Sequence, residues 1–341
     1  MNLALTDDQR MIRDAAASFL ADASDGAAVR AALEGSGIDY KLWKGIAELG
    51  WCGTAIDESH GGLGLGPVEL VLILEQMGRH LTCAPFFSSV ALAANLLAQA
   101  GSTAAQKKYL PQLASGALRA TVAFDAPQLK VAKNRLSGRV AAVLDAASAG
   151  LLLFVVKDAA YAVPADAKGL KVRPFETWDG TRRQADVELK NVAAEKVGAG
   201  KGIARAMALA RLYLAAEQLG GAQQCLDLVV KYTSERKQFG RAIASFQAVK
   251  HRCAQMMVQI ETLRSLVYGA AQSVDALECA GAKTLASETF FHCAGEAIQL
   301  HGGVGFTWEF EPQLHFKRAQ ATSHWLGTPA VLREQLAQAL L

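Results

Sequence analysis

The segment Arg236-Lys-Gln-Phe-Gly240 interrupts a long helical pattern, and the fold can be worked out from it in both directions. Before it, the spacing of apolar residues predicts a helix over about 203–234, and after it a second helix over 246–277. A third helix is predicted over 283–300. Because all three exceed the average length of globular helices and contain almost no proline, they are typical of an antiparallel helical bundle.

The pattern of apolar residues changes upstream of this bundle, from helical spacing to short runs. Short apolar runs such as Ala120–Phe124, Leu151–Val156 and Ala185–Leu189 are bounded by Gly, Pro, Asp or Asn, which predicts β-strands. Farther upstream the helical spacing returns. The predicted helices there cover about 39–50, 67–79, 85–100 and 103–115, and an earlier helix begins at a capping box of Thr6 and Gln9.

These patterns predict an α+β fold that is mainly α. We expect an N-terminal helical domain over 1–116, a small central β-domain over 117–198 and a C-terminal four-helix bundle over 199–341.

Composition excludes several classes of function. The net charge of +3 is spread along the chain, so there is no concentrated basic face for nucleic acid. The N-terminus lacks the features of a signal peptide, and the apolar run 150–156 is too short to cross a bilayer, so we expect a cytoplasmic protein without a membrane span. The six cysteines show neither CxxC pairs nor zinc-ligand spacing, which predicts buried thiols and no metal site.

Three glycine clusters invite a dinucleotide-binding interpretation. They are Gly61–Gly66, Gly198–Gly202 and Gly302–Gly305. A Rossmann fingerprint requires a strand, a tight turn and a helix in that order, and none of the three clusters has this context.

Two further elements follow Arg236-Lys-Gln-Phe-Gly240 in the chain, namely Gln299-Leu-His-Gly-Gly-Val-Gly305 and Gly327-Thr328. This order resembles the acyl-CoA dehydrogenase family, whose C-terminal domain carries R-x-Q/T-F-G, Q-x-x-G-G-x-G and x-E-G-T. The segment Leu49–Gly64 resembles the N-terminal part of the same family. The resemblance therefore covers essentially the whole chain.

The resemblance implies that FAD is the cofactor and an acyl-CoA the substrate. Arg236 would make a forked, charge-assisted contact with the flavin pyrophosphate, and Phe239 would pack on the adenosine side. Arg211 is implied in substrate binding. The other implied flavin contacts are Gln238, Phe246, Gln247, Gln299, Gly302, Gly303 and Thr328. In the family the first two motifs serve the flavin of a neighbouring subunit, whereas Thr328 would contact the flavin of its own chain.

The chain departs from the family at the catalytic base. The glutamate of E-G-T is replaced by Leu326, and the alternative base position, directly before Arg211, is Ala210. Neither side chain can accept a proton, so general-base catalysis of roughly 10²–10⁴-fold would be missing. The family segment T-E-P-x-x-G-S-D is also absent, because the chain reads Val122-Ala-Phe-Asp-Ala-Pro-Gln128.

Three other carboxylates are weaker candidates for the base. Glu309 and Glu311 follow the glycine turn, where a cap or a surface ion pair is expected. Glu217 lies in the middle of a predicted helix, where a structural role is expected. His301 flanks the glycine turn and is expected to bond a backbone carbonyl.

The segments Asp179-Gly-Thr-Arg-Arg183 and Gly305–Glu309 resemble the shortened subunits of heteromeric steroid side-chain acyl-CoA dehydrogenases. The leading interpretation is therefore a catalytically incomplete subunit that completes the flavin site of a paralogous partner in a heterotetramer. The substrate would be a bulky or steroid CoA thioester, and the acceptor an electron-transfer flavoprotein. Three alternatives stay open: a flavin-dependent monooxygenase of the same fold, a homo-oligomer with an unassigned base, and a non-catalytic scaffold subunit.

Overall fold

The computed structural model describes residues 4–341, which divide into two compact units. The helical unit contains the N-terminal segment through Val29, together with Val71–Thr82 and Arg211–Leu341. The strand-bearing unit contains Arg30–Leu70 and Cys83–Ala210. Each unit is therefore assembled from segments that are far apart in the sequence.

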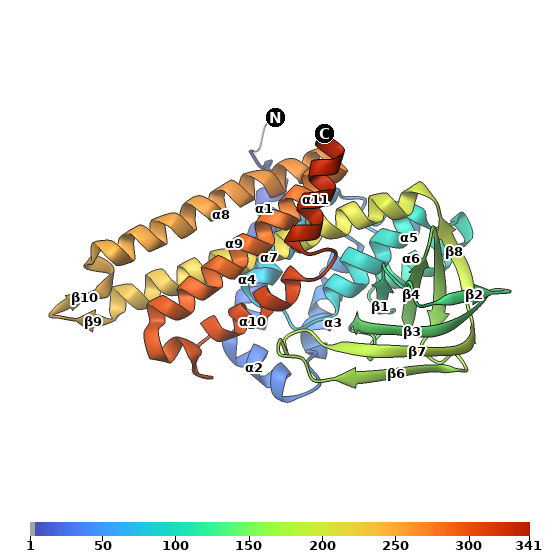
Figure 1. Cartoon of the computed structure of the whole chain (residues 1–341), viewed down its shortest axis with the longest axis horizontal. Helices are drawn as coiled ribbons and strands as arrows, with labels where there is room; N and C mark the ends of the chain where they lie inside the picture. Colours follow the sequence, from blue (N-terminus) through green and yellow to red (C-terminus); the bar gives the residue numbers. More distant parts are fainter. Residues whose placement is uncertain (1–3) are drawn as a thin grey trace. The chain divides into compact units, whose positions relative to one another are not determined.

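Long helices make up most of the helical unit, and α8 and α9 run side by side (Figure 1). Its helices are α1 (Asp7–Ala23), the part of α4 (Pro67–Arg79) from Val71, the part of α7 (Lys201–Glu235) from Arg211, α8 (Gln247–Ser273), α9 (Ala276–His301), α10 (Pro312–Ser323) and α11 (Pro329–Leu340). The capping box is confirmed, because Thr6 Oγ1 accepts from the Gln9 amide at 3.2 Å and Gln9 Oε1 accepts from the Thr6 amide at 3.1 Å. The mainly helical fold is likewise confirmed.

The strand-bearing unit combines short helices with the β-strands. Its helical segments are α3 (Tyr40–Glu48), the 3-10 turns Trp51–Gly53 and Glu58–His60, the π-helical Phe87–Ala94, α5 (Asn95–Ala100) and α6 (Thr103–Ala114). Its strands are β1 (Ala120–Ala123), β2 (Lys130–Ala132), β3 (Arg135–Leu144), β4 (Leu151–Val156), β5 (Ala159–Pro164), β6 (Leu170–Phe175), β7 (Gln184–Ala193) and β8 (Glu195–Ala199). The boundaries of the three expected domains stay a prediction.

Among the described residues, the strands of this unit form two four-stranded sheets, ordered β1-β4-β5-β8 and β2-β3-β7-β6. Only the β1–β4 pair among these neighbours is parallel. The sheets share one core, in which Leu136, Leu152, Phe154 and Val187 are completely buried. Every residue of β4 is buried, which explains its continuous apolar run.

Sequence patterns missed three helical features. The predicted helix over 85–100 is π-helical from Phe87 to Ala94 before α5 begins. Helices α2 (Gly26–Glu34) and α10 (Pro312–Ser323) were not predicted. The cysteines agree with the prediction of buried thiols, because none of the six is in a disulfide and five are buried. Within residues 4–341, no helix has both the length and the apolar character needed to cross a membrane.

Helices α4 and α7 cross with their backbones in direct contact. A Cβ on Gly220 of α7 would lie 1.7 Å from the carbonyl oxygen of Glu75, and a Cβ on Gly78 of α4 would lie 1.9 Å from the carbonyl oxygen of Glu217. No real Cβ approaches a backbone oxygen so closely. The crossing therefore requires glycine on both helices.

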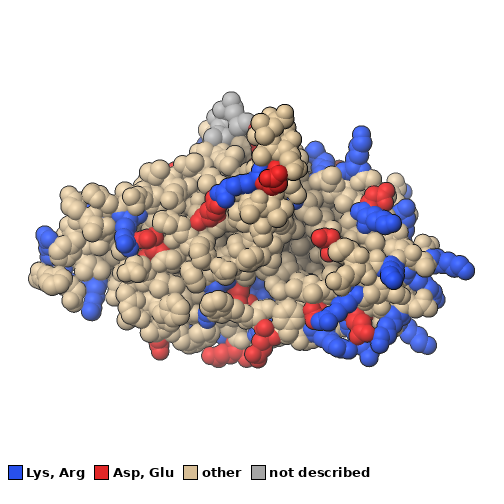
Figure 2. All heavy atoms as spheres, in the orientation of Figure 1, with Lys and Arg blue, Asp and Glu red and all other residues tan. Residues whose placement is uncertain are grey.

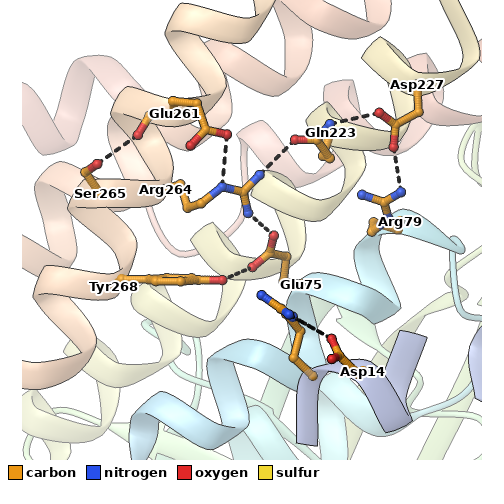
Figure 3. Close-up of polar contacts among 10 residues, drawn as sticks. Asp14, Glu75, Arg79, Gln223, Asp227, Glu261, Arg264, Ser265 and Tyr268 are labelled. Carbon is orange, nitrogen blue, oxygen red and sulfur yellow. Dashed lines mark hydrogen bonds and ion pairs between the residues drawn. The ribbon is translucent and has the colours of Figure 1, made fainter. Parts of the chain in front are cut away.

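A polar network reinforces this crossing (Figure 3). The buried carboxylate of Glu75 forms an ion pair with Arg264 of α8 and accepts a hydrogen bond from the Tyr268 hydroxyl at 2.7 Å. Arg264 also donates to Gln223 Oε1 of α7 at 2.8 Å. Burial and the neighbouring Glu75 carboxylate raise the pKa of Tyr268, which keeps its hydroxyl a donor at neutral pH. The network ties α4, α7 and α8 together.

We predict that Gly220→Ala destabilises the chain by roughly 1–3 kcal/mol or more, because the added methyl group must push two helix backbones apart. The matched control is Gly281→Ala in α9, where a Cβ would meet nothing within 4 Å. That change should stabilise by roughly 0.5–1 kcal/mol, since alanine is the better helix former. Urea unfolding midpoints measure both, and equal effects of the two substitutions would contradict the backbone crossing.

Candidate functional site

The predicted flavin-contact residues around Arg236 lie together in a hairpin between α7 and α8. Strands β9 (Lys237–Gln238) and β10 (Arg241–Ala242) pair antiparallel across a two-residue turn. Phe239 and Gly240 form this turn with φ of 53° and 77°, and positive φ at both positions is what a tight type I′ hairpin requires. Phenylalanine is unusual in this left-handed conformation.

The hairpin presents its side chains to solvent. The Phe239 side chain is 91% exposed, and Phe246 lies edge-on to it with ring centroids 6.1 Å apart. The guanidinium of Arg241 covers the Phe246 ring at 4.0 Å. Arg236 is exposed, as are Gln238 and Gln247, and it contacts no carboxylate among the described residues. Its guanidinium is thus available to an anion from outside the chain.

The second predicted motif ends α9 and begins the 3-10 segment Gly302–Phe306. Gly302 has φ 65° and ψ −146°, a conformation that is essentially limited to glycine. A Cβ on Gly302 or Gly303 would meet no atom of the chain within 4 Å, and Gln299 is exposed. The backbone of this turn is therefore open to approach.

An aromatic cluster brings the two motifs to the same end of the helical unit. Tyr232, near the end of α7, stacks on His301 with ring centroids 4.3 Å apart. Phe310 meets both rings edge-on. His301 Nδ1 bonds the Ala297 carbonyl at 2.7 Å, which confirms its expected structural role. The structure therefore joins the hairpin and the glycine turn, although their assignment as flavin contacts stays a prediction.

The third predicted motif, Gly327-Thr328, lies in the turn between α10 and α11, which Arg211 of α7 contacts. Arg211 donates from Nε to the carbonyl oxygen of Leu326 at 3.0 Å, and Thr328 accepts from the Val331 amide as the N-cap of α11. Arg211 and Glu235 are 24 residues apart on one continuous helix, which corresponds to about 36 Å. The chain therefore carries two separate groups of predicted cofactor contacts.

Neither usual base position carries a carboxylate. Ala210 is completely buried in α7. Leu326 occupies the turn between α10 and α11 with φ 58°, a left-handed conformation that is strained for leucine.

The three weaker candidates for the base differ in their surroundings. Glu217 is buried and forms an ion pair with Arg318 Nη1 at 2.6 Å, as expected for a structural carboxylate. Glu309 is exposed, and Glu311 is half-buried. Glu311 lines a cavity of about 200 Å³, and His80 and His315 line the same cavity. Burial and the Arg318 charge lower the pKa of His315 to about 3, so this imidazole is neutral.

Sequence reasoning missed several buried ionisable residues in the helical unit, and two of them have a clear structural role. One is Glu75, whose partner Arg264 is 189 positions away. The other is Lys283 in α9, which has no exposed surface. In the sequence, the only sign that these two residues are buried is that their neighbours are apolar. Among the described residues, no group of three or more His, Cys, Asp or Glu side chains could hold a metal ion.

Comparison with family descriptions agrees with this architecture. Residues 6–117 match "Acyl-CoA dehydrogenase, N-terminal domain", and residues 200–341 match "Acyl-CoA dehydrogenase, C-terminal domain". The acyl-CoA dehydrogenase IpdE2 of Mycolicibacterium smegmatis is 34% identical, and the alignment covers 97% of each chain.

Solved structures of similar proteins have the same fold. A chain of the ChsE4-ChsE5 complex from Mycobacterium tuberculosis superimposes with a TM-score of 0.93 at 27% identity, covering 100% of this chain and 99% of that one. The Tcur3481-Tcur3483 steroid ACAD G363A variant gives a TM-score of 0.92 at 29% identity over 98% of each chain.

Glu217→Gln tests whether this carboxylate is structural. The substitution removes the negative charge that pairs with the buried Arg318, so we predict a loss of roughly 3–5 kcal/mol in unfolding free energy. The control is Glu288→Gln, which breaks an exposed pair with Arg333 and should change stability by roughly 0–1 kcal/mol. Urea unfolding measures both. Unchanged stability together with lost catalysis would instead identify Glu217 as a base.

Proposed function

The chain belongs to the acyl-CoA dehydrogenase family, and we propose that it is a subunit of an FAD-dependent enzyme that desaturates a CoA thioester. In this proposal the chain lacks its own catalytic base and completes the flavin site of a partner subunit. This proposal rests on the distance of about 36 Å along α7 between the exposed hairpin and the Arg211–Leu326 turn. Contacts so far apart suit two flavins held at different subunit boundaries.

The residues at the hairpin end fit a dinucleotide cofactor. The Arg236 guanidinium would hold the pyrophosphate, and Phe239 would cover an adenosine ring. The open backbone at Gly302 and Gly303 would allow close approach of the phosphates, with Gln299 beside it. Bound FAD would supply the acceptor for the hydride that leaves the substrate.

The residues at the Arg211–Leu326 turn can bind a ligand but cannot accept a proton from it. The backbone amide of Leu326 is retained in place of the family glutamate, so a thioester carbonyl could still be polarised there. Arg211 holds this turn through the Leu326 carbonyl. Since Leu326 and Ala210 offer no carboxylate, the α-proton would be removed by a glutamate of the partner.

An apolar surface supports assembly with another subunit. On the face drawn in Figure 2, few charged side chains lie over α8 and α9, apart from basic residues at the hairpin. Exposed apolar side chains on this part of the helical unit are Phe239, Met257, Val258, Phe291, Phe306 and Trp308. An interface with another subunit would cover these apolar side chains.

The similarity to a chain of the ChsE4-ChsE5 complex supports a partner that is a paralogous subunit. The similarity to a structure named a steroid ACAD supports a bulky, steroid-derived acyl group in the substrate. We further propose an electron-transfer flavoprotein as the electron acceptor, in keeping with the family.

Arg236→Ala tests the flavin contact at the hairpin. In the assembled oligomer we predict a tenfold or greater loss of FAD affinity, because a charged hydrogen bond contributes roughly 1.5–3 kcal/mol. Lys237→Ala is the control, since it removes a neighbouring exposed charge from the same hairpin. Flavin absorbance after serial dilution measures retention. Equal retention in both variants would show that Arg236 does not hold the flavin.

Leu326→Glu tests the missing base. We predict that the purified, partner-free chain does not bleach flavin with an acyl-CoA under anaerobic conditions. If its own site accepts flavin, Leu326→Glu should introduce bleaching, whereas Leu326→Gln, which matches it in shape and backbone strain, should not. Robust bleaching by the wild-type chain that is lost in Glu309→Gln or Glu311→Gln would contradict the proposal and identify a relocated base.

A further inference from the structure

Lys283 is a fully buried lysine, and no carboxylate within residues 4–341 forms an ion pair with it. It lies on α9, and its Nζ donates to Ser287 Oγ at 2.8 Å and to the carbonyl oxygen of Ser323 at 3.0 Å. Ser287 in turn bonds the Gln218 side chain of α7, which also donates to Thr322 Oγ1 of α10 at 3.0 Å. One polar network therefore links α7, α9 and the last turn of α10.

The charge of Lys283 does not stabilise the fold. Burial, with a smaller contribution from the Arg211 charge, lowers the pKa of Lys283 to about 7. The unfolded chain keeps this lysine protonated up to about pH 10. Between these values the unfolded state binds more protons, so the contribution of Lys283 to stability becomes more favourable as the pH rises. Below about pH 7 Lys283 is charged in the folded protein as well, and the burial of this charge then lowers the free energy of unfolding by its full amount.

The unfavourable charge of Lys283 lies at the C-terminus of α10, where it can stabilise the carbonyl groups of the last turn. Ser323 is the last residue of α10, whose own last turn contains no basic residue. The carbonyl groups at a helix C-terminus carry partial negative charge and are stabilised by a nearby cation. Lys283 supplies that cation from α9, and Arg211 supplies a second one from α7 by donating to the Leu326 carbonyl.

The turn from Ser323 to Thr328 requires such support. Leu326 has φ 58° and Gly327 has φ 109°, so the backbone passes through two left-handed residues in succession. A leucine in this conformation persists only when its surroundings hold it there. The two basic side chains bond the backbone directly at Ser323 and Leu326, on either side of the turn's exposed His324.

We propose that Lys283 is a positioning residue, which acts through Ser323 and together with Arg211 to hold the turn of Ser323–Thr328 in its ligand-facing conformation. The identity of that ligand, a flavin and a CoA thioester, rests on the function proposed above. The role of Lys283 in the turn itself does not.

The other titratable groups on the surrounding helices are accounted for. Glu217 of α7 is paired with Arg318 of α10, and Glu288 of α9 is paired with Arg333 of α11. Cys279 of α9 is a buried thiol that interacts with Arg211. His324 lies within the turn itself and is exposed to solvent. Among the described residues no carboxylate contacts Lys283 or Arg211, so loss of the Lys283 proton removes one of the two cations that donate hydrogen bonds to the backbone of the turn. When the turn opens while α9 stays folded, Lys283 remains buried and loses the Ser323 carbonyl, so its charge favours the closed turn. The hold on the turn should therefore weaken as the pH rises through about 7.

Amide hydrogen exchange of residues 324–334 tests this proposal without any flavin. After correction for intrinsic exchange rates, protection of this segment in the wild-type chain should fall roughly fivefold from about pH 6 to about pH 8.5, as expected for loss of a cation at a helix C-terminus. In Lys283→Met the segment should exchange fast at both pH values. The same variant should have a higher melting temperature than wild type at about pH 6, because the buried charge is gone.

Two further variants make the result decisive. Lys250→Met, at an exposed position of α8, should keep the wild-type exchange and its pH profile. Ser287→Ala removes one partner of Lys283 but retains the charge, so it should show intermediate protection even if Lys283→Met does not fold. Wild-type protection with the wild-type pH profile in Lys283→Met, or in Ser287→Ala if the former is unfolded, would overturn the proposal. A chain with the expected exchange that binds no flavin would overturn only the proposed function.

Discussion

Two glycines allow α4 and α7 to cross in backbone contact, and much of the helical unit depends on this crossing. Because Gly78 and Gly220 have no Cβ, the carbonyl of Glu75 can approach α7 and the carbonyl of Glu217 can approach α4. The same two glutamates extend charged side chains to other helices, Glu75 to Arg264 of α8 and Glu217 to Arg318 of α10. The close approach thus positions the carboxylates that bind the outer helices to the centre.

The length of α7 determines how the predicted site is divided. A single helix of 35 residues carries Arg211 in its first half and leads directly into the hairpin at its other end. A rigid helix cannot bring these two groups to one small ligand of the same chain. The division follows from elementary helix geometry, and the two ends differ in character: one carries an exposed, aromatic and basic hairpin, and the other a turn held by Arg211 and Lys283.

The turn of Ser323–Thr328 has an unusual distribution of charge. Two basic side chains donate hydrogen bonds to its backbone, and its Leu326 side chain is apolar. The low pKa of Lys283 follows mainly from burial, with a smaller contribution from the Arg211 charge. The turn therefore combines cationic support of its backbone with a side chain, Leu326, that cannot accept a proton.

Sequence by itself determined the features that depend on close neighbours. The apolar spacing predicted α4, α7, α8 and α9, the capping box predicted the start of α1, and the identity of Leu326 excluded a base at that position. Such patterns can be read directly because helix and strand periods involve residues only a few positions apart. The motif residues at the α7–α8 connection and at the end of α9 could also be found, since each motif is contiguous in the chain.

Only the tertiary structure decided which charges are buried and what they contact. Glu75 meets a partner 189 positions away, Glu217 meets one 101 positions away, and Lys283 reaches the end of a helix 40 positions away. In sequence, each of these residues is a polar position within an apolar helix and cannot be told apart from a solvated one. The pKa and the role of a buried charge depend on desolvation and on the groups around it, and these exist only after distant segments have packed together.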